Sequence, residues 1–322
     1  MREKFFIETR GCAALMLIAG LLATLLAWSV GSVDPVSHTH GLLFPSPGTW
    51  IADPLWRLIG ALAIDVVAFM GMFALTRAYN LVRDANYLPA GLFMVLQGAT
   101  AVSTGAFSGG GLMLITALLS TILFFSIYQY PEGTRRILAV FVMLGAGALT
   151  QYGFLPFVIV YFIGAVQMRV MSLRAVVAIL AGLLVPAWIL LGSGLYPLDA
   201  VMWPRIVNPF DEGLTMSKVA VLATVAVTLV IGMVCGGLNM VTVYTRNART
   251  RAFNGLIAGT GIMAGLMCVA DLTNIGFYIP VLNLATAYQL SLFYGIRHNH
   301  GVSVAVWSLC GLYACLFVWS LF

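Results

Sequence analysis

Eleven apolar runs, separated by short polar connections, follow one another along the whole chain. They lie at 11–32, 58–76, 88–107, 112–128, 137–152, 154–168, 175–192, 219–243, 255–275, 278–296 and 302–321. A helix needs about 20 residues to cross the ~30 Å hydrocarbon core of a bilayer, and most of the runs approach that length. We therefore predict an all-α integral membrane protein, a polytopic bundle of about 11 transmembrane helices.

The composition supports one membrane domain without a soluble part. Hydrophobic residues make up 61% of the chain and charged residues only 8%, whereas soluble domains average about a quarter charged. We accordingly treat 1–322 as a single transmembrane domain. The runs at 137–152 and 154–168 are short and are joined only by the sequence GFLP, so they are either tilted or include a re-entrant segment. This leaves ten to twelve crossings open.

The basic residues predict the orientation, because short cytoplasmic loops carry an excess of Lys and Arg. With a cytoplasmic N-terminus, thirteen of the 16 basic residues fall inside: Arg2, Lys4, Arg10, Arg77, Arg83, Arg135, Arg136, Arg169, Arg174, Arg246, Arg249, Arg251 and Arg297. Only Arg57, Arg205 and Lys218 fall outside. We predict a periplasmic C-terminus and an uncleaved signal-anchor helix at 11–32. The basic residues never gather into a stripe, which argues against a nucleic-acid partner.

Two outer segments, 33–57 and 193–218, combine Pro and Gly with aromatic residues. This composition is typical of loops at the membrane interface. Because both segments are too apolar to extend into water, we expect them to approach each other and cover the bundle. The sequence SGGG at 108–111 lacks the Lys of a phosphate-binding loop and is interpreted as a tight turn.

The outer segments also hold the residues that could carry chemistry outside the membrane. The candidate outer-face acids are Asp34, Asp53, Asp199, Asp211, Glu212 and Asp271. Asp34 and Asp53, in the sequences SVDP and IADP, resemble in placement the essential acid that glycosyltransferases with lipid-linked sugar donors keep in their first outer loop, although an Asp-Pro dipeptide also starts many turns. His38 and His40 have the residue type of zinc ligands, but the usual spacing and a fourth ligand are missing. We predict no metal site and no cofactor.

Asp65 is the strongest candidate for a functional residue within the membrane, because it lies alone in an otherwise uncharged span. It falls about eight residues, or ~12 Å, into the second run, where an acid facing lipid costs several kcal/mol. It should therefore face the bundle interior. The candidate polar partners on the third and fourth runs are Gln97, Thr100, Thr104, Thr116 and Ser120. Of these, Gln97, Thr100 and Ser120 should lie nearest to the depth of Asp65.

Three roles are open for this intramembrane polar cluster. Polar side chains commonly bond helices to one another in membranes, usually for less than ~1 kcal/mol each. The same groups could relay a proton or an ion, or line a ligand pocket. The sequence shows no inverted repeat that would single out a transporter.

Two further stretches carry a resemblance to a known family. They are YLPAGLFMVLQ at 87–97 and, more distinctively, the segment 150–194, with Gln167, Met168, Arg169, the run 172–174, Pro186 and Trp188. These stretches resemble the DUF6427-like group of polytopic inner-membrane proteins from Bacteroidetes over about a third of the chain. The resemblance implies an inner-membrane location in a Gram-negative envelope, and it implies no particular reaction.

Three hypotheses about function follow. The first is a cell-envelope biogenesis component that handles or scaffolds lipid-linked glycan at the periplasmic face. The second is a secondary transporter that uses Asp65 as a proton or cation site, and the third is a non-catalytic structural membrane subunit. The expected partners are the lipid bilayer, lipid-linked glycan and other membrane proteins. Whether the chain is an enzyme is left open.

Overall fold

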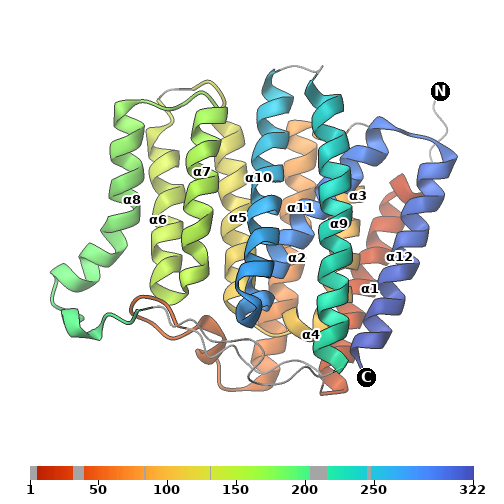
Figure 1. Ribbon diagram of the computed structural model, residues 1–322, viewed down its shortest axis with the longest axis horizontal. Helices are drawn as coiled ribbons and strands as arrows, with labels where there is room; N and C mark the ends of the chain where they lie inside the picture. The colour runs from red at the N-terminus through yellow and green to blue at the C-terminus, as the bar shows by residue number, and fades with distance from the viewer. Residues whose placement is uncertain (1–5, 32–39, 83–84, 131, 204–215, 245–247) are drawn as a thin grey trace.

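The computed structural model describes residues 6–31, 40–82, 85–130, 132–203, 216–244 and 248–322. Over these residues the protein is a bundle of helices, and its one β feature is an isolated bridge between His40 and Pro45 (Figure 1). Among the described residues, eight helices are long and apolar enough to cross a membrane. They are α1 (Arg10–Ser29), α2 (Pro54–Tyr79), α5 (Gly109–Ser126), α8 (Leu173–Gly192), α9 (Met216–Tyr244), α10 (Ala248–Ala270), α11 (Ile275–Ile296) and α12 (His300–Ser320).

The remaining helices are shorter, and they refine the predicted spans. They are α3 (Leu88–Ala99), α4 (Ala101–Thr104), α6 (Thr134–Thr150) and α7 (Leu155–Gln167), with short 3-10 turns at Phe6–Glu8, Pro47–Thr49, Tyr152–Phe154, Leu198–Ala200 and Leu272–Asn274. Every predicted run thus coincides with a helix, and the fold class is confirmed. The run at 88–107 differs in one respect: it forms two helices, α3 and α4, with the interruption at Thr100.

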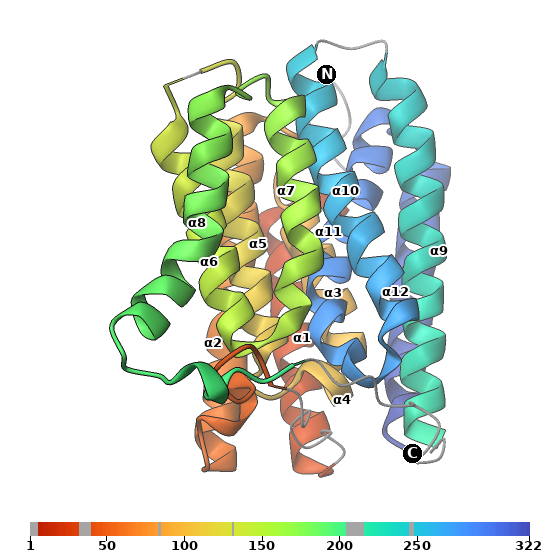
Figure 2. The ribbon, with the colours of Figure 1, turned by 60° about the vertical axis from the view of Figure 1, so that its left-hand side comes forward.

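Successive helices alternate in direction, so that the chain connections gather at two ends of the bundle (Figures 1 and 2). One end, upper in Figure 1, holds the start of α1 and the connections that precede α3, α6, α8, α10 and α12. Nine described basic residues belong to it: Arg10, Arg77, Arg135, Arg136, Arg169, Arg174, Arg249, Arg251 and Arg297. We call this the basic end. Arg57 and Lys218 belong to the opposite end.

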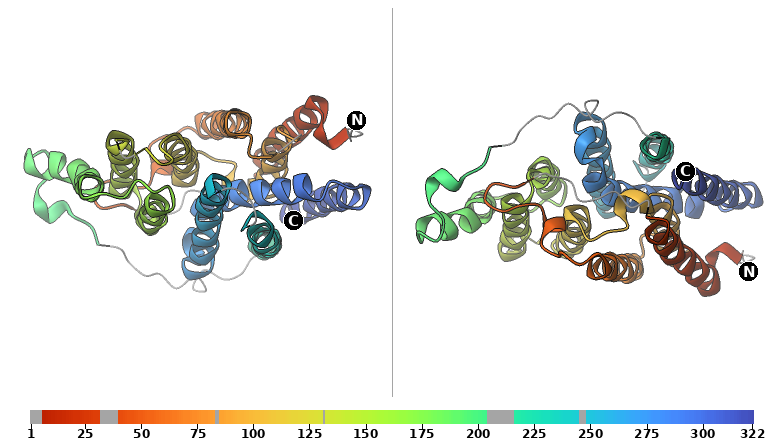
Figure 3. Two further views of the ribbon diagram at one scale, coloured as in Figure 1. Left: turned by 90° about the horizontal axis from the view of Figure 1, so that it is seen from above. Right: turned by 90° about the horizontal axis from the view of Figure 1, so that it is seen from below.

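Helix α11 occupies the centre of the bundle and α8 its edge (Figure 3). α11 packs against α3, α5, α9 and α10, whereas α8 packs chiefly against α6. Glycines allow that second contact to be close: a Cβ added to Gly182 of α8 would lie 3.0 Å from the Leu138 carbonyl oxygen, and one added to Gly145 of α6 would lie 2.8 Å from the Leu183 carbonyl oxygen. Small residues at helix contacts are the usual means of close packing in membranes.

The prediction of a tight turn at 108–111 is wrong. Ser108 has extended backbone angles, φ −152° and ψ 170°, and Gly109 begins α5. A Cβ added to Gly110 would lie 2.6 Å from the Gly276 carbonyl oxygen, so the absence of a side chain lets the start of α5 touch the start of α11. The glycines therefore serve helix packing rather than chain reversal.

The two outer loops contact each other, as predicted, over their described residues. The Met202 amide donates a hydrogen bond of 3.0 Å to the Leu42 carbonyl, and the rings of Phe44 and Tyr196 meet edge to face at 5.3 Å. The first loop also caps α6, since the amides of Leu42 and Phe44 donate to carbonyl groups in its last turn. These carbonyls would otherwise lack partners at the helix end. The loops thus form one layer across the end opposite the basic end.

Candidate functional site

Asp65 lies in the interior of the bundle, 3% exposed. It is eleven residues beyond Pro54 in the 26-residue helix α2, or about 17 Å along a helix of about 39 Å. Its carboxyl group is hydrogen-bonded to the side-chain amide of Gln97 on α3, which is also 3% exposed. Among the described residues, no Lys or Arg forms an ion pair with Asp65. An ion pair elsewhere in the described chain joins Glu8 and His298.

Asn283 on α11 extends this contact into a network across three helices. Its Nδ2 donates to Gln97 Oε1 at 3.1 Å and to Thr100 Oγ1 at 3.1 Å. Because Gln97 Oε1 accepts from Asn283, the Gln97 Nε2 group is the one that remains to donate to Asp65. The side chains of Asp65, Gln97, Thr100 and Asn283 form what we call the Asp65 network.

The Asp65 network lies where the third predicted span is interrupted. Thr100 has φ −105° and ψ 15°, values that end α3, and its hydroxyl donates to the carbonyls of Leu96 and Gln97 at 3.1 Å. Thr104 on α4 is buried as well and donates to the Thr100 carbonyl at 3.1 Å. Irregular backbone at membrane depth is tolerated only inside protein or beside water, and here side-chain hydroxyls satisfy the carbonyls.

Two of the predicted partners lie elsewhere. Thr116 on α5 is half-buried and does not belong to the Asp65 network. Ser120 is buried, but with Thr121 it lies against the hydroxyl of Tyr161 from α7. The direction in which the polar face of α5 points depends on packing, which the spacing of the residues does not determine.

A second polar network, which the sequence interpretation missed, lies on α11 nearer the basic end. Gln289 accepts from Asn239 Nδ2 of α9 at 2.9 Å and donates through Nε2 to Asn254 Oδ1 of α10 at 3.1 Å. All three side chains are buried. The four amide side chains of Asn239, Asn254, Asn283 and Gln289 are visible in the sequence as departures from purely apolar spans. Because a buried amide needs a partner as a buried acid does, they were the signal that could have predicted both networks.

Two of the three described outer-face acids have structural roles. Asp53 caps α2 by accepting from the Leu55 amide at 2.8 Å. Asp271 accepts from Asn274 Nδ2 at 2.9 Å and from the Tyr278 hydroxyl at 3.0 Å, at the junction of α10 and α11. Asp199 lies exposed in the turn Leu198–Ala200. Asp34, Asp211 and Glu212 lie outside the described residues, as does His38. No group of three potential metal ligands occurs among the residues described.

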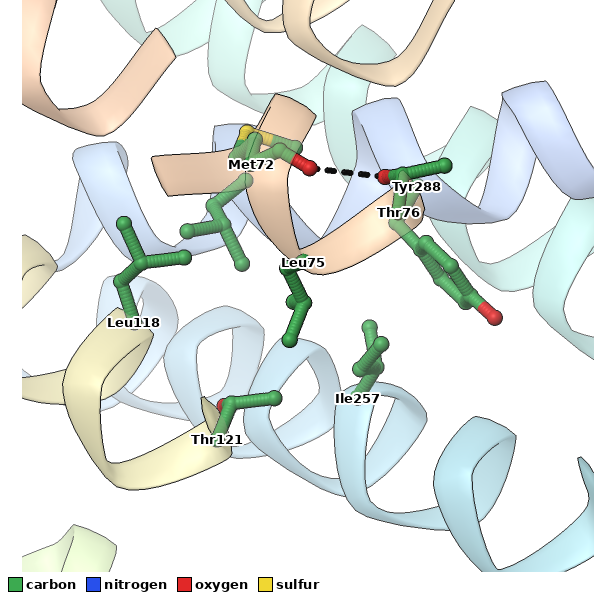
Figure 4. A pocket seen from close by; sticks show the side chains of 8 residues that line it. Met72, Leu75, Thr76, Leu118, Thr121, Ile257 and Tyr288 are labelled. Atoms are coloured by element: carbon green, nitrogen blue, oxygen red, sulfur yellow. Dashed lines mark hydrogen bonds between the residues drawn. The ribbon is translucent and has the colours of Figure 1, made fainter. Parts of the chain in front are cut away.

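A small cavity lies between α2, α5, α10 and α11, and no residue of the Asp65 network lines it (Figure 4). It is lined by Met72, Leu75, Thr76, Leu118, Thr121, Ile257, Leu284 and Tyr288. Its volume is about 10 Å³, room for one water molecule. The Thr76 hydroxyl donates to the Met72 carbonyl at 2.8 Å, so that it does not offer its proton to the cavity. The interior between these four helices is therefore closely packed.

Comparison with known proteins adds no relative: no family model, no curated protein and no solved structure matches the chain. The class of the protein therefore rests on its own fold. It is a multi-pass α-helical membrane protein with a buried acid in a hydrogen-bonded network near the middle of the bundle.

Proposed function

We propose that the protein is a secondary transporter in which Asp65 binds and releases a proton. The observation that carries the proposal is the Asp65 network itself, a nearly fully buried acid joined to α3 and α11 through Gln97 and Asn283. Acids inside membranes are costly, and they commonly serve ion pathways and proton relays. An acid that only joined helices could be replaced by an amide at lower cost in desolvation.

A proton fits the Asp65 network better than a metal ion does. Binding of a cation such as Na⁺ needs several oxygen ligands directed at one point. Gln97 Oε1 and Thr100 Oγ1 already accept hydrogen bonds from Asn283, so these oxygens would have to leave their partners. A proton needs only the Asp65 carboxylate.

The surrounding helices have the weak points that proton exchange would require. α3 is interrupted at Thr100, and α11 contains Pro280 three residues before Asn283. Proline removes one backbone hydrogen bond and loosens the helix there. Transporters often place their binding sites at such discontinuous helices. We infer that rotation about these points moves Gln97 relative to Asp65 and opens the carboxyl group to water.

The periplasmic glycan hypothesis has less support. Asp53 and Asp271 each hold a helix end in place, and such a role accounts for a carboxylate at either position. Asp199 is exposed in a short turn with no second acid shown beside it. A role in a Gram-negative inner membrane, as the resemblance to the DUF6427-like group implies, is compatible with transport and stays a prediction.

Proton exchange at Asp65 can be tested directly on the purified protein in lipid. Infrared difference spectra between low and high pH should contain the carbonyl bands of the carboxyl groups that take up a proton, and Asp65→Asn should remove the component that arises from buried Asp65. Asp53→Asn is the matched control, because it makes the same chemical change at a helix cap where Asn serves as well as Asp.

Proton flux can be measured in liposomes that contain a pH dye. An imposed potential, negative inside, should acidify the interior for the native protein and for Asp65→Glu, and not for Asp65→Asn. An unchanged spectrum and unchanged flux in Asp65→Asn would refute the proposal.

We also propose that the basic end faces the cytoplasm, because nine described Arg residues gather there against Arg57 and Lys218 at the other end. Cysteine labelling tests this orientation. In a chain whose five native cysteines are replaced by alanine, Arg249→Cys should react with an impermeant maleimide only after the membrane is opened. Labelling of Arg249→Cys in intact cells would show that the basic end faces the outside and would contradict the proposed orientation.

A further inference from the structure

A second cavity, larger than the one between α2, α5, α10 and α11, opens at the basic end, away from the Asp65 network. It measures about 270 Å³ and is lined by Tyr128, Gln167, Arg169, Ala248, Arg251, Ala252 and Gly255. None of these seven residues is acidic. We propose that this cavity, which we call the arginine pocket, binds a phosphate-bearing anion.

The pocket is built where three helices end or begin. Ala248, Arg251, Ala252 and Gly255 follow the spacing i, i+3, i+4, i+7, so they form one face of the first two turns of α10. Gln167 is the last residue of α7, and Tyr128 follows the end of α5. The Gln129 amide donates to the Met168 carbonyl at 2.9 Å and thereby fixes these last two segments together.

The donors that line the arginine pocket suit phosphate. A guanidinium group offers several N–H donors in a planar fork that matches phosphate oxygens, and two such groups, from Arg169 and Arg251, line the cavity. Gln167 and Tyr128 add an amide and a hydroxyl. The first turn of α10 contributes backbone N–H groups and the positive end of the helix dipole, which favours anions further.

The backbone around the pocket carries two unusual features. Arg169 has φ +58°, a left-handed conformation that costs free energy in any residue other than glycine. Gly255 has no side chain, and a Cβ there would lie 2.9 Å from Gln167 Oε1. The first feature places an arginine where a glycine is usual at a helix end, and the second lets the Gln167 amide lie directly against α10 in the wall of the pocket.

The surface next to the pocket is apolar, as a lipid site requires. Ile159, Phe162, Ile163 and Val166 on α7 are between 43% and 56% exposed and lead along the helix towards Gln167 and Arg169. A phospholipid could place its acyl chains on this face and its headgroup phosphate in the arginine pocket. Basic pockets between transmembrane helices are a known mode of headgroup binding. A soluble phosphate compound would use the same donors without the apolar face.

Native mass spectrometry of the protein in nanodiscs distinguishes these sources. The test compares nanodiscs of phosphatidylcholine containing phosphatidylglycerol with nanodiscs of phosphatidylcholine alone to which glycerol 3-phosphate or inorganic phosphate is added. We expect one retained phosphatidylglycerol molecule per chain. The Arg169→Gln/Arg251→Gln double variant should bind it about 25-fold more weakly, about fivefold for each arginine.

Two further variants separate the pocket from general surface charge. Arg135→Gln/Arg174→Gln removes the same charge from exposed positions at the same end and should change the affinity less than about threefold. Gly255→Leu keeps both pocket arginines but places a bulky side chain in the pocket wall against Gln167, and it should weaken binding as strongly as the double variant. Folding of every variant is checked by its melting temperature.

The outcomes decide the proposal. Binding of phosphatidylglycerol that depends on the pocket arginines and on Gly255 supports a headgroup site. Binding of glycerol 3-phosphate or inorganic phosphate alone, with the same dependence, supports a site for a soluble phosphate compound. Equal losses in the pocket and control variants, or no retained anion of either kind, would overturn it. None of these outcomes depends on proton exchange at Asp65.

Discussion

Helices α11 and α8 reverse the relation between burial and polarity that holds in water-soluble proteins. In the most apolar 18-residue stretch of each helix, 89% of the α11 residues are buried and only 22% of the α8 residues. The mean hydropathy nevertheless is 1.2 for α11 and 2.5 for α8. The more buried helix is the more polar one, because the exposed surface of α8 suits hydrocarbon while α11 can satisfy polar groups on its neighbours.

The comparison explains where function can reside in this fold. Asn283 and Gln289 of α11 hold partners on α3, α9 and α10, and so a change at either residue reaches several helices. Large apolar side chains of α8 are exposed on the surface that would face lipid, and the helix packs on the bundle chiefly through α6. Substitutions of one kind should therefore have opposite consequences in the two helices.

The largest difference is expected from one substitution made in both helices. Leu282→Ala on α11 removes a side chain that is 3% exposed and should lower the free energy of unfolding by about 2–5 kcal/mol, since it leaves a cavity. Leu180→Ala on α8 removes one that is 55% exposed and should cost about 0.5 kcal/mol or less, because lipid fills the space. Unfolding in mixed micelles with increasing SDS measures both. Equal losses would mean that α11 is not the core of the bundle.

A polar substitution on α11 should come next in size. Gln289→Leu makes the helix more apolar but removes the donor to Asn254 Oδ1, at about 1–3 kcal/mol. Asn239 loses one of its two bonds to residue 289 and keeps the other, in which its Nδ2 donates to the backbone carbonyl at 2.7 Å. We expect a loss of about 1–3 kcal/mol in the same assay. The control is Thr242→Val on the exposed face of α9, which should stay within about 0.5 kcal/mol. A stability gain from Gln289→Leu would show that apolar character alone decides stability here.

The edge helix has its own sensitive point, at the contact with α6. Gly182→Leu should cost about 1–3 kcal/mol, because the new side chain meets backbone atoms of α6 that cannot move aside easily. Gly237→Leu on α9 is the control, since a Cβ there has nothing within 4 Å. Disulfide trapping between cysteines placed on α6 and α8 would report separation of the two helices. If both glycine variants behave alike, the close contact does not hold α8.

The sequence alone predicted the helices well and the contacts between them only in part. Apolar runs locate spans because each must cover the same hydrocarbon thickness, and this signal is local. Asp65 and Gln97 could be matched in depth from helical rise. Ser120 could not be placed, because its direction depends on how α5 rotates against α7, and that rotation depends on packing between distant parts of the chain.

The missed features have physical reasons as well. Thr100 interrupts a run that remains apolar on both sides, so hydropathy shows no gap between α3 and α4. The glycines at 109–111 have the composition of a turn, but here they permit a close helix contact with Gly276. Asn283 and Gln289 were not predicted as site residues because an uncharged amide disturbs the hydropathy of a span less than a carboxylate does. A buried amide nevertheless requires a hydrogen-bond partner, as a buried carboxylate does.

The smallest effect on the free energy of unfolding is expected near the two ends of α11, where tyrosine hydroxyls donate hydrogen bonds to carboxyl groups. Tyr278 donates to Asp271 Oδ2 at 3.0 Å, and Tyr294 donates to Glu8 Oε1 at 2.9 Å near the basic end. Both acids keep other partners: Asn274 stays with Asp271, and His298 stays 2.6 Å from Glu8. Each Tyr→Phe variant should therefore lose only about 1 kcal/mol.

The two Tyr→Phe effects should be independent, which makes them a test of α11 as one rigid unit. The hydroxyls belong to residues sixteen positions apart, or about 24 Å along the helix, and distant changes add within about 0.5 kcal/mol. Tyr278→Phe, Tyr294→Phe and the double variant, measured together, give the coupling free energy. Tyr196→Phe in the outer loop, where the ring packs on Phe44, serves as the control. A coupling well above that limit would mean that the ends of α11 communicate through the Asp65 network between them.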